Sequence, residues 1–198
     1  MKPHAFIFIG RSGCGKGTQV ELLKPFLTEK TKLPIFYVET GTAFRQFILG
    51  EGYSEKLSHE AYERADRQSD FLACYMWSKL LIEGFDGKSH VIFDGVARSL
   101  NEARLLGTAL TFYSFEKVHI IYLDVSRGWS EKHLRSRGRA DDKREGDIEK
   151  RLDWFDQDVM PAVDYLKNSS YHFVSINGER PIPEVSADIL NSLTPFFA

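Results

Sequence analysis

The sequence is short of cysteine and has no marked excess of charge of either sign. Its 198 residues contain only two cysteines, Cys14 and Cys74, which are too few for a disulfide framework or a four-thiolate zinc site. The 26 basic residues are balanced by 28 acidic ones, for a formal net charge of −2. Because nucleic-acid-binding proteins usually carry a clear basic excess, we expect no nucleic-acid partner.

Long apolar runs are also missing. The run at residues 5–9 is too short to span a membrane, and no small-residue cleavage site follows it. We therefore expect a cytoplasmic protein without a membrane partner. A composition of 42% hydrophobic and 27% charged residues is ordinary for a globular protein, and this length suits a single domain with a substantial core.

Short apolar segments alternate with helical ones along the chain. The sequence predicts strands at residues 5–9, 34–38, 90–93, 118–123 and 171–176. It predicts helices at about 16–27, over much of 41–83, at 145–166 and from about 183. Apolar strands separated by helices indicate a parallel sheet covered on both faces. We therefore expect an α/β fold of three layers, α/β/α, around a five-stranded parallel sheet, with ligands at the carboxyl ends of the strands.

A glycine-rich loop follows the first predicted strand. Residues 10–18 read Gly-Arg-Ser-Gly-Cys-Gly-Lys-Gly-Thr. Glycines let the backbone N–H groups converge on phosphate oxygens, and the following helix presents its positive end to the same anion. The alternative is a glycine-rich turn with a chance lysine, which the flanking strand and helix make a poor explanation. We predict a P-loop that binds ATP, formed by Gly13, Cys14, Gly15, Lys16, Gly17 and Thr18.

The position after the lysine departs from the general P-loop pattern. Gly17 stands where a serine or threonine normally binds Mg²⁺, and Thr18 comes one position later. We therefore expect Mg²⁺ to be held mainly by nucleotide phosphates and water.

Four segments, in this order, resemble the signatures of the adenylate kinase and nucleoside-monophosphate kinase family. They are the loop at residues 10–19, the segment 40–45 (Thr-Gly-Thr-Ala-Phe-Arg), the segment 94–98 (Asp-Gly-Val-Ala-Arg) and the arginine-rich stretch 135–152. The resemblance extends from residue 5 to about residue 190. It implies an ATP-dependent nucleoside-monophosphate kinase, in the first place an adenylate kinase that reversibly converts ATP and AMP into two ADP.

The same resemblance implies a domain plan. One P-loop kinase domain spans residues 1–198, with a core at 1–39, 84–134 and 143–198. A helical acceptor-binding arm covers about 40–83, and a very short lid covers about 135–142. The family also implies a monomer whose ligands are nucleotides and Mg²⁺.

The resemblance further assigns side chains to roles. Because a migrating phosphoryl group spreads charge over its oxygens, positioning and fixed positive charge supply most of the rate. Transfer is assigned to Lys16, Arg98, Arg139 and Arg151. Arg135 and Arg139 join the loop at the ATP site, with Arg137 as an alternative to Arg135. The acceptor site is assigned to Thr40, Gly41, Arg45, Gln68, Gly95, Arg98, Glu102 and Arg151. Asp141 and Asp142 are expected to brace the lid arginines, and Asp94 to lie near the water shell of the metal.

Two departures from the family pattern leave alternatives open. Glu102 stands where adenylate kinases commonly have a glutamine that pairs with adenine, and an ionised glutamate can only accept hydrogen bonds. It would suit a base with a ring N–H, unless it points to solvent or Asn101 makes the base contact. A kinase for UMP, CMP or GMP is therefore one alternative. A nucleotide-binding regulator without transfer activity is another, because Val96-Ala97 replaces an aromatic–proline pair and the lid is minimal. A kinase for an alcohol would need a general base, and no motif supplies one.

Overall fold

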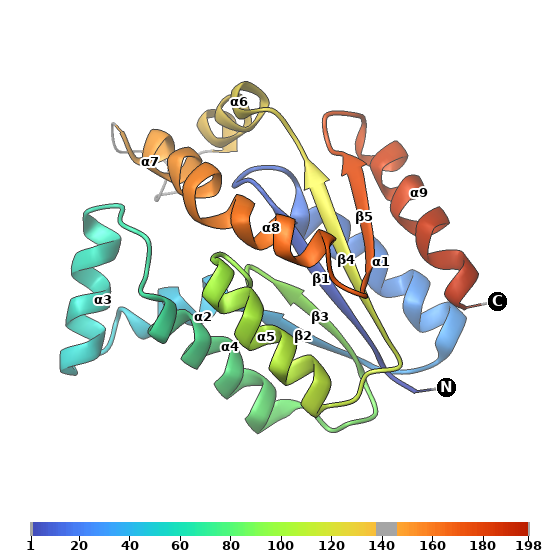
Figure 1. The fold of residues 1–198 in the computed structure, drawn as a ribbon. Helices are drawn as coiled ribbons and strands as arrows, with labels where there is room; N and C mark the ends of the chain where they lie inside the picture. Colours follow the sequence, from blue (N-terminus) through green and yellow to red (C-terminus); the bar gives the residue numbers. More distant parts are fainter. Residues whose placement is uncertain (1, 138–145, 198) are drawn as a thin grey trace.

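The computed structural model describes residues 2–137 and 146–197 (Figure 1). Within these ranges five parallel strands form one sheet in the order β2-β3-β1-β4-β5. The strands are β1 (His4–Gly10), β2 (Ile35–Glu39), β3 (His90–Asp94), β4 (Lys117–Asp124) and β5 (His172–Asn177). Each of the five predicted strands is present at nearly its predicted position, which confirms the expected parallel α/β architecture.

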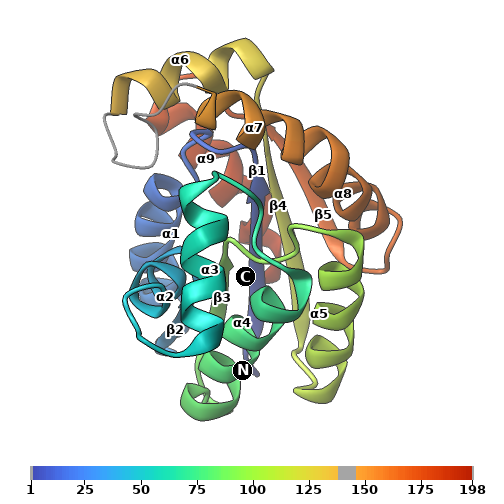
Figure 2. The ribbon, with the colours of Figure 1, turned by 90° about the vertical axis from the view of Figure 1, so that its left-hand side faces the viewer.

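Helices cover both faces of the sheet. They are α1 (Lys16–Thr31), α2 (Thr40–Phe47), α3 (Tyr53–Glu63), α4 (Asp70–Gly84), α5 (Leu100–Phe112), α6 (Arg127–Arg137), α7 (Asp147–Trp154), α8 (Met160–Lys167) and α9 (Ile182–Leu193). Figure 2 shows the layers from the side, with α1 on one side of the sheet and α5 and α8 on the other. None of the helices in the described part of the chain is long and apolar enough to cross a membrane.

The core lies on the two faces of the central strand β1. Ala5, Ile7 and Ile9 pack toward α4, α5 and α8, whereas Phe6 and Phe8 pack toward α1 and α9. All five side chains are buried. This alternation follows from the two-residue period of a strand, and each fully buried large apolar side chain contributes about 1.5–3 kcal/mol. Strands that are apolar on both faces therefore hold the sheet between two helical layers.

The long helix predicted at residues 145–166 is interrupted. It is divided into α7, a π-helical turn at Phe155–Val159, and α8. The Met160 N–H donates to the Phe155 carbonyl five residues back, and the next residue, Pro161, has no N–H to donate. The missing donor at Pro161 accompanies the local change from α to π geometry.

Candidate functional site

A cavity of 1080 Å³ opens at the carboxyl edge of the sheet. The glycine-rich loop, the ends of β2 and β3, and parts of α2, α6 and α7 all contribute to its wall. Its wall includes Gly13, Cys14, Gly15, Lys16, Gly17, Thr18, Thr40, Gly41, Arg45, Gln68, Asp94, Gly95, Arg98 and Arg151. Residues from both predicted sites, far apart in the sequence, therefore surround one space.

The glycine-rich loop connects β1 to α1 and has the conformation its sequence requires. Gly13 and Gly15 have φ angles of 84° and 92°, in the left-handed region that favours glycine. Gly15 is the N-cap of α1 and supplies no side-chain cap, so the first N–H groups of the helix face the cavity side without a capping side chain. Lys16 Nζ donates to the carbonyls of Gly10 (2.8 Å) and Arg11 (3.2 Å). The loop thus gathers a lysine and a helix N-terminus at one point, an arrangement that suits phosphate.

A second cationic group lies across the cavity, where β2 and β3 end. The Thr40 hydroxyl donates to the Gly95 carbonyl (2.7 Å) and ties the two strand ends together. Gly95 has a φ angle of 82°, which favours glycine, and a Cβ added there would lie 2.7 Å from the Thr40 hydroxyl oxygen and 2.8 Å from an Arg98 nitrogen. Arg45 donates to the Thr42 hydroxyl (2.7 Å) and lies 3.8 Å from Glu39. Two arginines therefore line the side of the cavity where β2 and β3 end.

Asp94 and Gln68 also line this cavity, each with a fixed partner. Tyr37 donates its hydroxyl to Asp94 Oδ2 (3.1 Å). Burial, followed by the charge of Asp94, raises the pKa of Tyr37, so the hydroxyl keeps its proton. Gln68 exchanges two hydrogen bonds with Ser58, one through its amide nitrogen (2.9 Å) and one through its oxygen (2.7 Å). The Gln68 amide therefore stabilises the return of the arm from α3 to α4.

Comparison with known proteins places the chain in a family. The AAA domain family model matches residues 9–149. An adenylate kinase of Prochlorococcus marinus strain MIT 9515 is 30% identical, over 96% of this chain and 97% of that protein. The chain belongs to the adenylate kinase family. Other adenylate kinases, from Flavobacterium psychrophilum and Nostoc, are 29% and 28% identical over 94% of this chain and 98% and 97% of their own lengths.

Arg135 does not have the position that the sequence analysis expected. In this adenylate kinase family member it is exposed on α6, and it forms ion pairs with Glu131 (2.7 Å) and Glu149 (2.8 Å) away from the cavity wall. The cavity-facing residues of α6 are instead Trp129, His133 and Ser136. The reason is helical phase, because residues 129, 133 and 136 share a face from which residue 135 is rotated.

Trp129 and His133 are cavity residues that the sequence analysis missed. Their rings stack with centroids 3.5 Å apart. His133 Nδ1 lies 2.9 Å from the Trp129 carbonyl, which can only accept, so this nitrogen carries the proton. The four-residue spacing of two aromatic rings, which is the spacing of one helical face, was the available signal, but no helix was predicted over these residues. The predicted lid residues Arg139, Asp141 and Asp142 lie outside the described residues, as does the side chain of Arg137.

Glu102 also departs from its expected place. The side chain is fully buried, does not line the cavity, and accepts a hydrogen bond from the Arg98 N–H (2.7 Å). In return the Ser99 hydroxyl accepts from the Glu102 N–H (3.1 Å). This is a variant of the capping box, and the sequence Ser99-Leu100-Asn101-Glu102 was its signature. Glu102 therefore caps α5 beneath Arg98 and neither reaches the cavity nor points to solvent. Burial raises the pKa of its carboxyl group.

Proposed function

We propose that the protein is an adenylate kinase that transfers the terminal phosphoryl group of ATP to AMP and, in reverse, forms ATP and AMP from two ADP. One observation carries this proposal: a phosphate loop with Lys16 shares a cavity with a separate arginine pair, Arg45 and Arg98. A protein that only binds ATP has no use for a second phosphate clamp. The acceptor is already an anion, so the reaction needs no general base and depends on positioning and positive charge.

On the donor side, ATP phosphates replace the two carbonyls that now bind Lys16, and the loop N–H groups bind their oxygens. The base then lies beyond the phosphates, between α6 and the loop that follows β5. Both elements touch the phosphate loop, since an added Cβ at Gly13 would meet Leu134 (3.1 Å) and one at Gly178 would lie 3.7 Å from the Cys14 carbonyl. Trp129 offers the flat surface on which such a base stacks.

On the acceptor side, Arg45 and Arg98 are proposed to bind the monophosphate, with Thr40 and Gly41 beside its base. Arg151 enters the cavity from α7 and is proposed to bridge the migrating phosphoryl group, together with Arg139 of the lid. Asp141 and Asp142 remain proposed braces of the lid arginines. The lid then excludes water and suppresses hydrolysis of ATP.

The residues present fit a Mg²⁺ ion that is held mainly through phosphates and water. In the described ranges, no cluster of three or more His, Cys, Asp or Glu side chains is arranged to hold a metal. Asp94 lies on the strand next to the loop, in register with Phe8 of β1, and could accept from metal-bound water. When bound, the ion would neutralise charge on the donor phosphates. We further propose that the enzyme is cytoplasmic and that it is a monomer, the latter because the family resemblance implies it.

A coupled assay for ADP formation tests the proposal. Purified protein with Mg-ATP is supplied with AMP, GMP, CMP, UMP or dTMP in turn. We expect AMP to be strongly preferred, since the buried Glu102 does not select a base with a ring N–H. Preference for another monophosphate would support the kinase activity but show that AMP is not the acceptor. No transfer to any of them would favour the nucleotide-binding regulator. Lys16→Met should lower turnover by about 100-fold or more, whereas the exposed Lys30→Met on the same helix should not.

A further inference from the structure

The π-helical turn at Phe155–Val159 lies beside the cavity, which its first and last residues line. Its first residue is tied to the helix before it, because the Phe155 N–H donates to the Arg151 carbonyl. Two of its carboxylates form ion pairs with different parts of the site: Asp156 pairs with Arg11 of the phosphate loop, and Asp158 with Arg67 of the acceptor arm. The turn that follows Arg151 is therefore attached to both sides.

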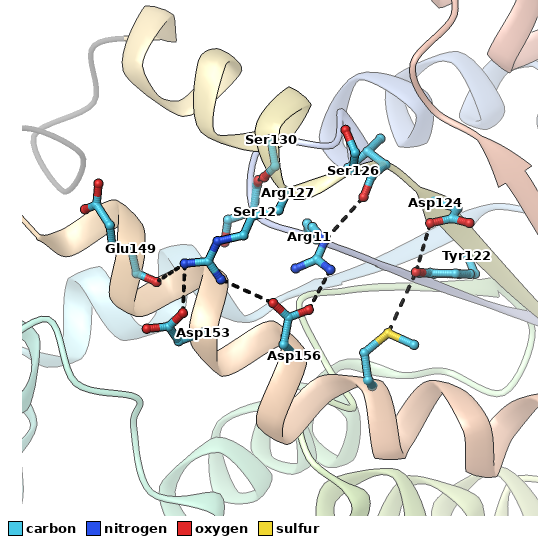
Figure 3. A network of polar contacts seen from close by, with 12 residues as sticks. Arg11, Ser12, Tyr122, Asp124, Ser126, Arg127, Ser130, Glu149, Asp153 and Asp156 are labelled. Carbon is cyan, nitrogen blue, oxygen red and sulfur yellow. Dashed lines mark hydrogen bonds and ion pairs between the residues drawn. The ribbon is translucent and has the colours of Figure 1, made fainter.

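The attachment on the donor side is extensive (Figure 3). Arg11 donates to Asp156 Oδ1 (2.6 Å) and to the Val125 carbonyl (3.2 Å), and its guanidinium lies 4.4 Å from the centre of the Phe155 ring. Arg127 of α6 donates to the other oxygen of Asp156 (3.2 Å). The two guanidinium groups hold the pKa of Asp156 below its usual value, Arg11 most strongly. Asp156 thus remains ionised between two arginines.

Arg11 acts through the loop and does not line the cavity itself. Its side chain is only 14% exposed, while its carbonyl accepts from Lys16 Nζ (3.2 Å). A movement of Arg11 would therefore move the surroundings of the lysine that is proposed to bind phosphate.

On the acceptor side, an arginine also pairs with a carboxylate of the π turn. Arg67 Nε lies 3.3 Å from Asp158, and Arg67 Nη1 lies 2.5 Å from Asp70 at the start of α4. Unlike Arg11, Arg67 lines the cavity. Nearby, Lys150 of α7 donates to the Arg64 carbonyl (2.7 Å). The return of the acceptor arm is therefore fastened to the helix that carries Arg151.

We propose that Asp156 and Asp158 are positioning residues for phosphoryl transfer, one for the donor half and one for the acceptor half. Together they set Arg151 at a fixed place between the phosphate loop and the acceptor arm. This inference rests on the proposed kinase function. A π turn interrupts the regular hydrogen bonding of an α-helix and is often found at functional sites. The ion pairs of Asp156 and Asp158 fix the position of this turn relative to the phosphate loop and the acceptor arm.

Matched substitutions test the two halves separately. Asp156→Asn and Asp158→Asn remove one charge each, and Asp153→Asn is the control, since Asp153 carries the same charge one turn earlier and pairs with Arg127 (2.8 Å). We expect Asp156→Asn to weaken binding of a non-hydrolysable ATP analogue, and Asp158→Asn to weaken binding of AMP, each by roughly tenfold in calorimetry. Both should lower kcat, and Asp153→Asn should change each quantity less than about twofold.

A double-mutant cycle tests whether Arg11 and Asp156 act together. Because each acts through the other, Arg11→Met with Asp156→Asn should be no worse than the worse single variant. Arg11→Lys should bind the ATP analogue as weakly as Arg11→Met, since an ammonium cannot bond Asp156 and Val125 while it stacks on Phe155. Asp156→Glu should bind it more tightly than Asp156→Asn, because it keeps the carboxylate. Thermal unfolding of each variant reports whether the fold is intact.

Three results would overturn the inference: additive effects in the cycle, equal effects of Asp156→Asn and Asp158→Asn on both ligands, or losses that only follow the unfolding temperature. Because binding is measured apart from turnover, a complete absence of transfer in the unsubstituted protein would count against the proposed function alone. The binding comparison would still support or overturn the positioning roles.

Discussion

Arg98 lies near the end of the connection between β3 and α5, just before the N-cap Ser99, and it is close to Gly95, whose carbonyl binds Thr40. Replacing it by alanine removes one arm of the proposed acceptor clamp and leaves the phosphate loop unchanged. Since hydrogen bonds to charged groups contribute about 1.5–3 kcal/mol each, we expect the KM for the monophosphate to rise by about 10- to 100-fold. The KM for ATP should change little. Steady-state kinetics with each substrate varied in turn measures both constants.

Arg104→Ala supplies the control for that experiment, because Arg104 is exposed on α5 and carries the same charge. It should leave both constants near their original values. If Arg98→Ala damaged ATP affinity and spared the acceptor, the proposed division of the cavity would be wrong.

Residues that follow strand ends were placed well by the sequence. Lys16, Thr40 and Arg98 each come within a few residues of a strand end, and all three line the cavity. Parallel strands bring such positions to one edge whatever the details of packing. The position of Arg135 was predicted wrongly, because helical phase cannot be read from distance to a strand end. Arg135 lies on a helix, where each residue is rotated by about 100°, so a two-residue offset from His133 turns the side chain away from the cavity.

At the level of elements, the buried carboxylate of Glu102 in the first turn of α5 accepts a hydrogen bond from the Arg98 N–H. Glu102→Gln keeps an acceptor for the Arg98 N–H and removes a group whose pKa burial raises. We expect this variant to be at least as stable as the original protein and to keep the same acceptor preference. Glu102→Ala leaves the Arg98 N–H without this partner and creates a cavity, so it should lower the free energy of unfolding by about 1–3 kcal/mol. Thermal denaturation and the acceptor panel measure the two effects.

A change of acceptor base in Glu102→Gln would contradict the capping role and return Glu102 to the base site. The matched surface substitution Glu83→Gln, at an exposed position of α4, should alter neither stability nor preference.

The elements themselves were predicted unevenly. Strands with apolar runs were found within a few residues, because burial on both faces leaves a continuous signal. The π turn at Phe155–Val159 was not predicted, since its neighbours keep the apolar spacing of a helix and one turn of different geometry does not interrupt that pattern. The ion pairs of the two carboxylates in this turn, with Arg11 and with Arg67, could therefore be recognised only in three dimensions.

At the scale of the whole molecule, the order of the strands in the sheet creates a feature that the alternation of strands and helices in the sequence does not predict. The order β2-β3-β1-β4-β5 places four histidines side by side near the amino ends of neighbouring strands: His90, His4, His119 and His172. His4 Nδ1 lies 3.0 Å from His119 Nε2, and His119 Nδ1 lies 3.0 Å from His172 Nδ1. His90 accepts from the His4 N–H (2.9 Å). Each ring–ring hydrogen bond requires one nitrogen without a proton, so the row is built for neutral imidazoles.

This row should make the protein less stable in mild acid. Burial lowers the pKa of all four histidines, that of His90 to about 4. Lys117 lowers the pKa of three of them further, whereas Glu116 opposes the shift at His4. An unfolded histidine titrates near pH 6.5, so below that pH the unfolded chain binds protons that the folded chain refuses. The stability contributed by the neutral row is complete above about pH 6.5 and is lost as the pH falls toward the folded values.

We therefore expect the midpoint of thermal unfolding to fall by roughly 5 °C between pH 7 and pH 5. His119→Gln keeps a polar group in the row and removes its most deeply shifted titrating member, so the dependence on pH should become shallower even if stability at pH 7 also changes. His59→Gln, at an exposed position on α3, should keep the original slope. Circular dichroism melts at half-unit steps of pH give all three slopes. If the neutral row causes the pH dependence, removing one titrating histidine must reduce the slope of the unfolding midpoint against pH. Equal slopes for His119→Gln and the unsubstituted protein would therefore mean that other groups cause the loss of stability in acid.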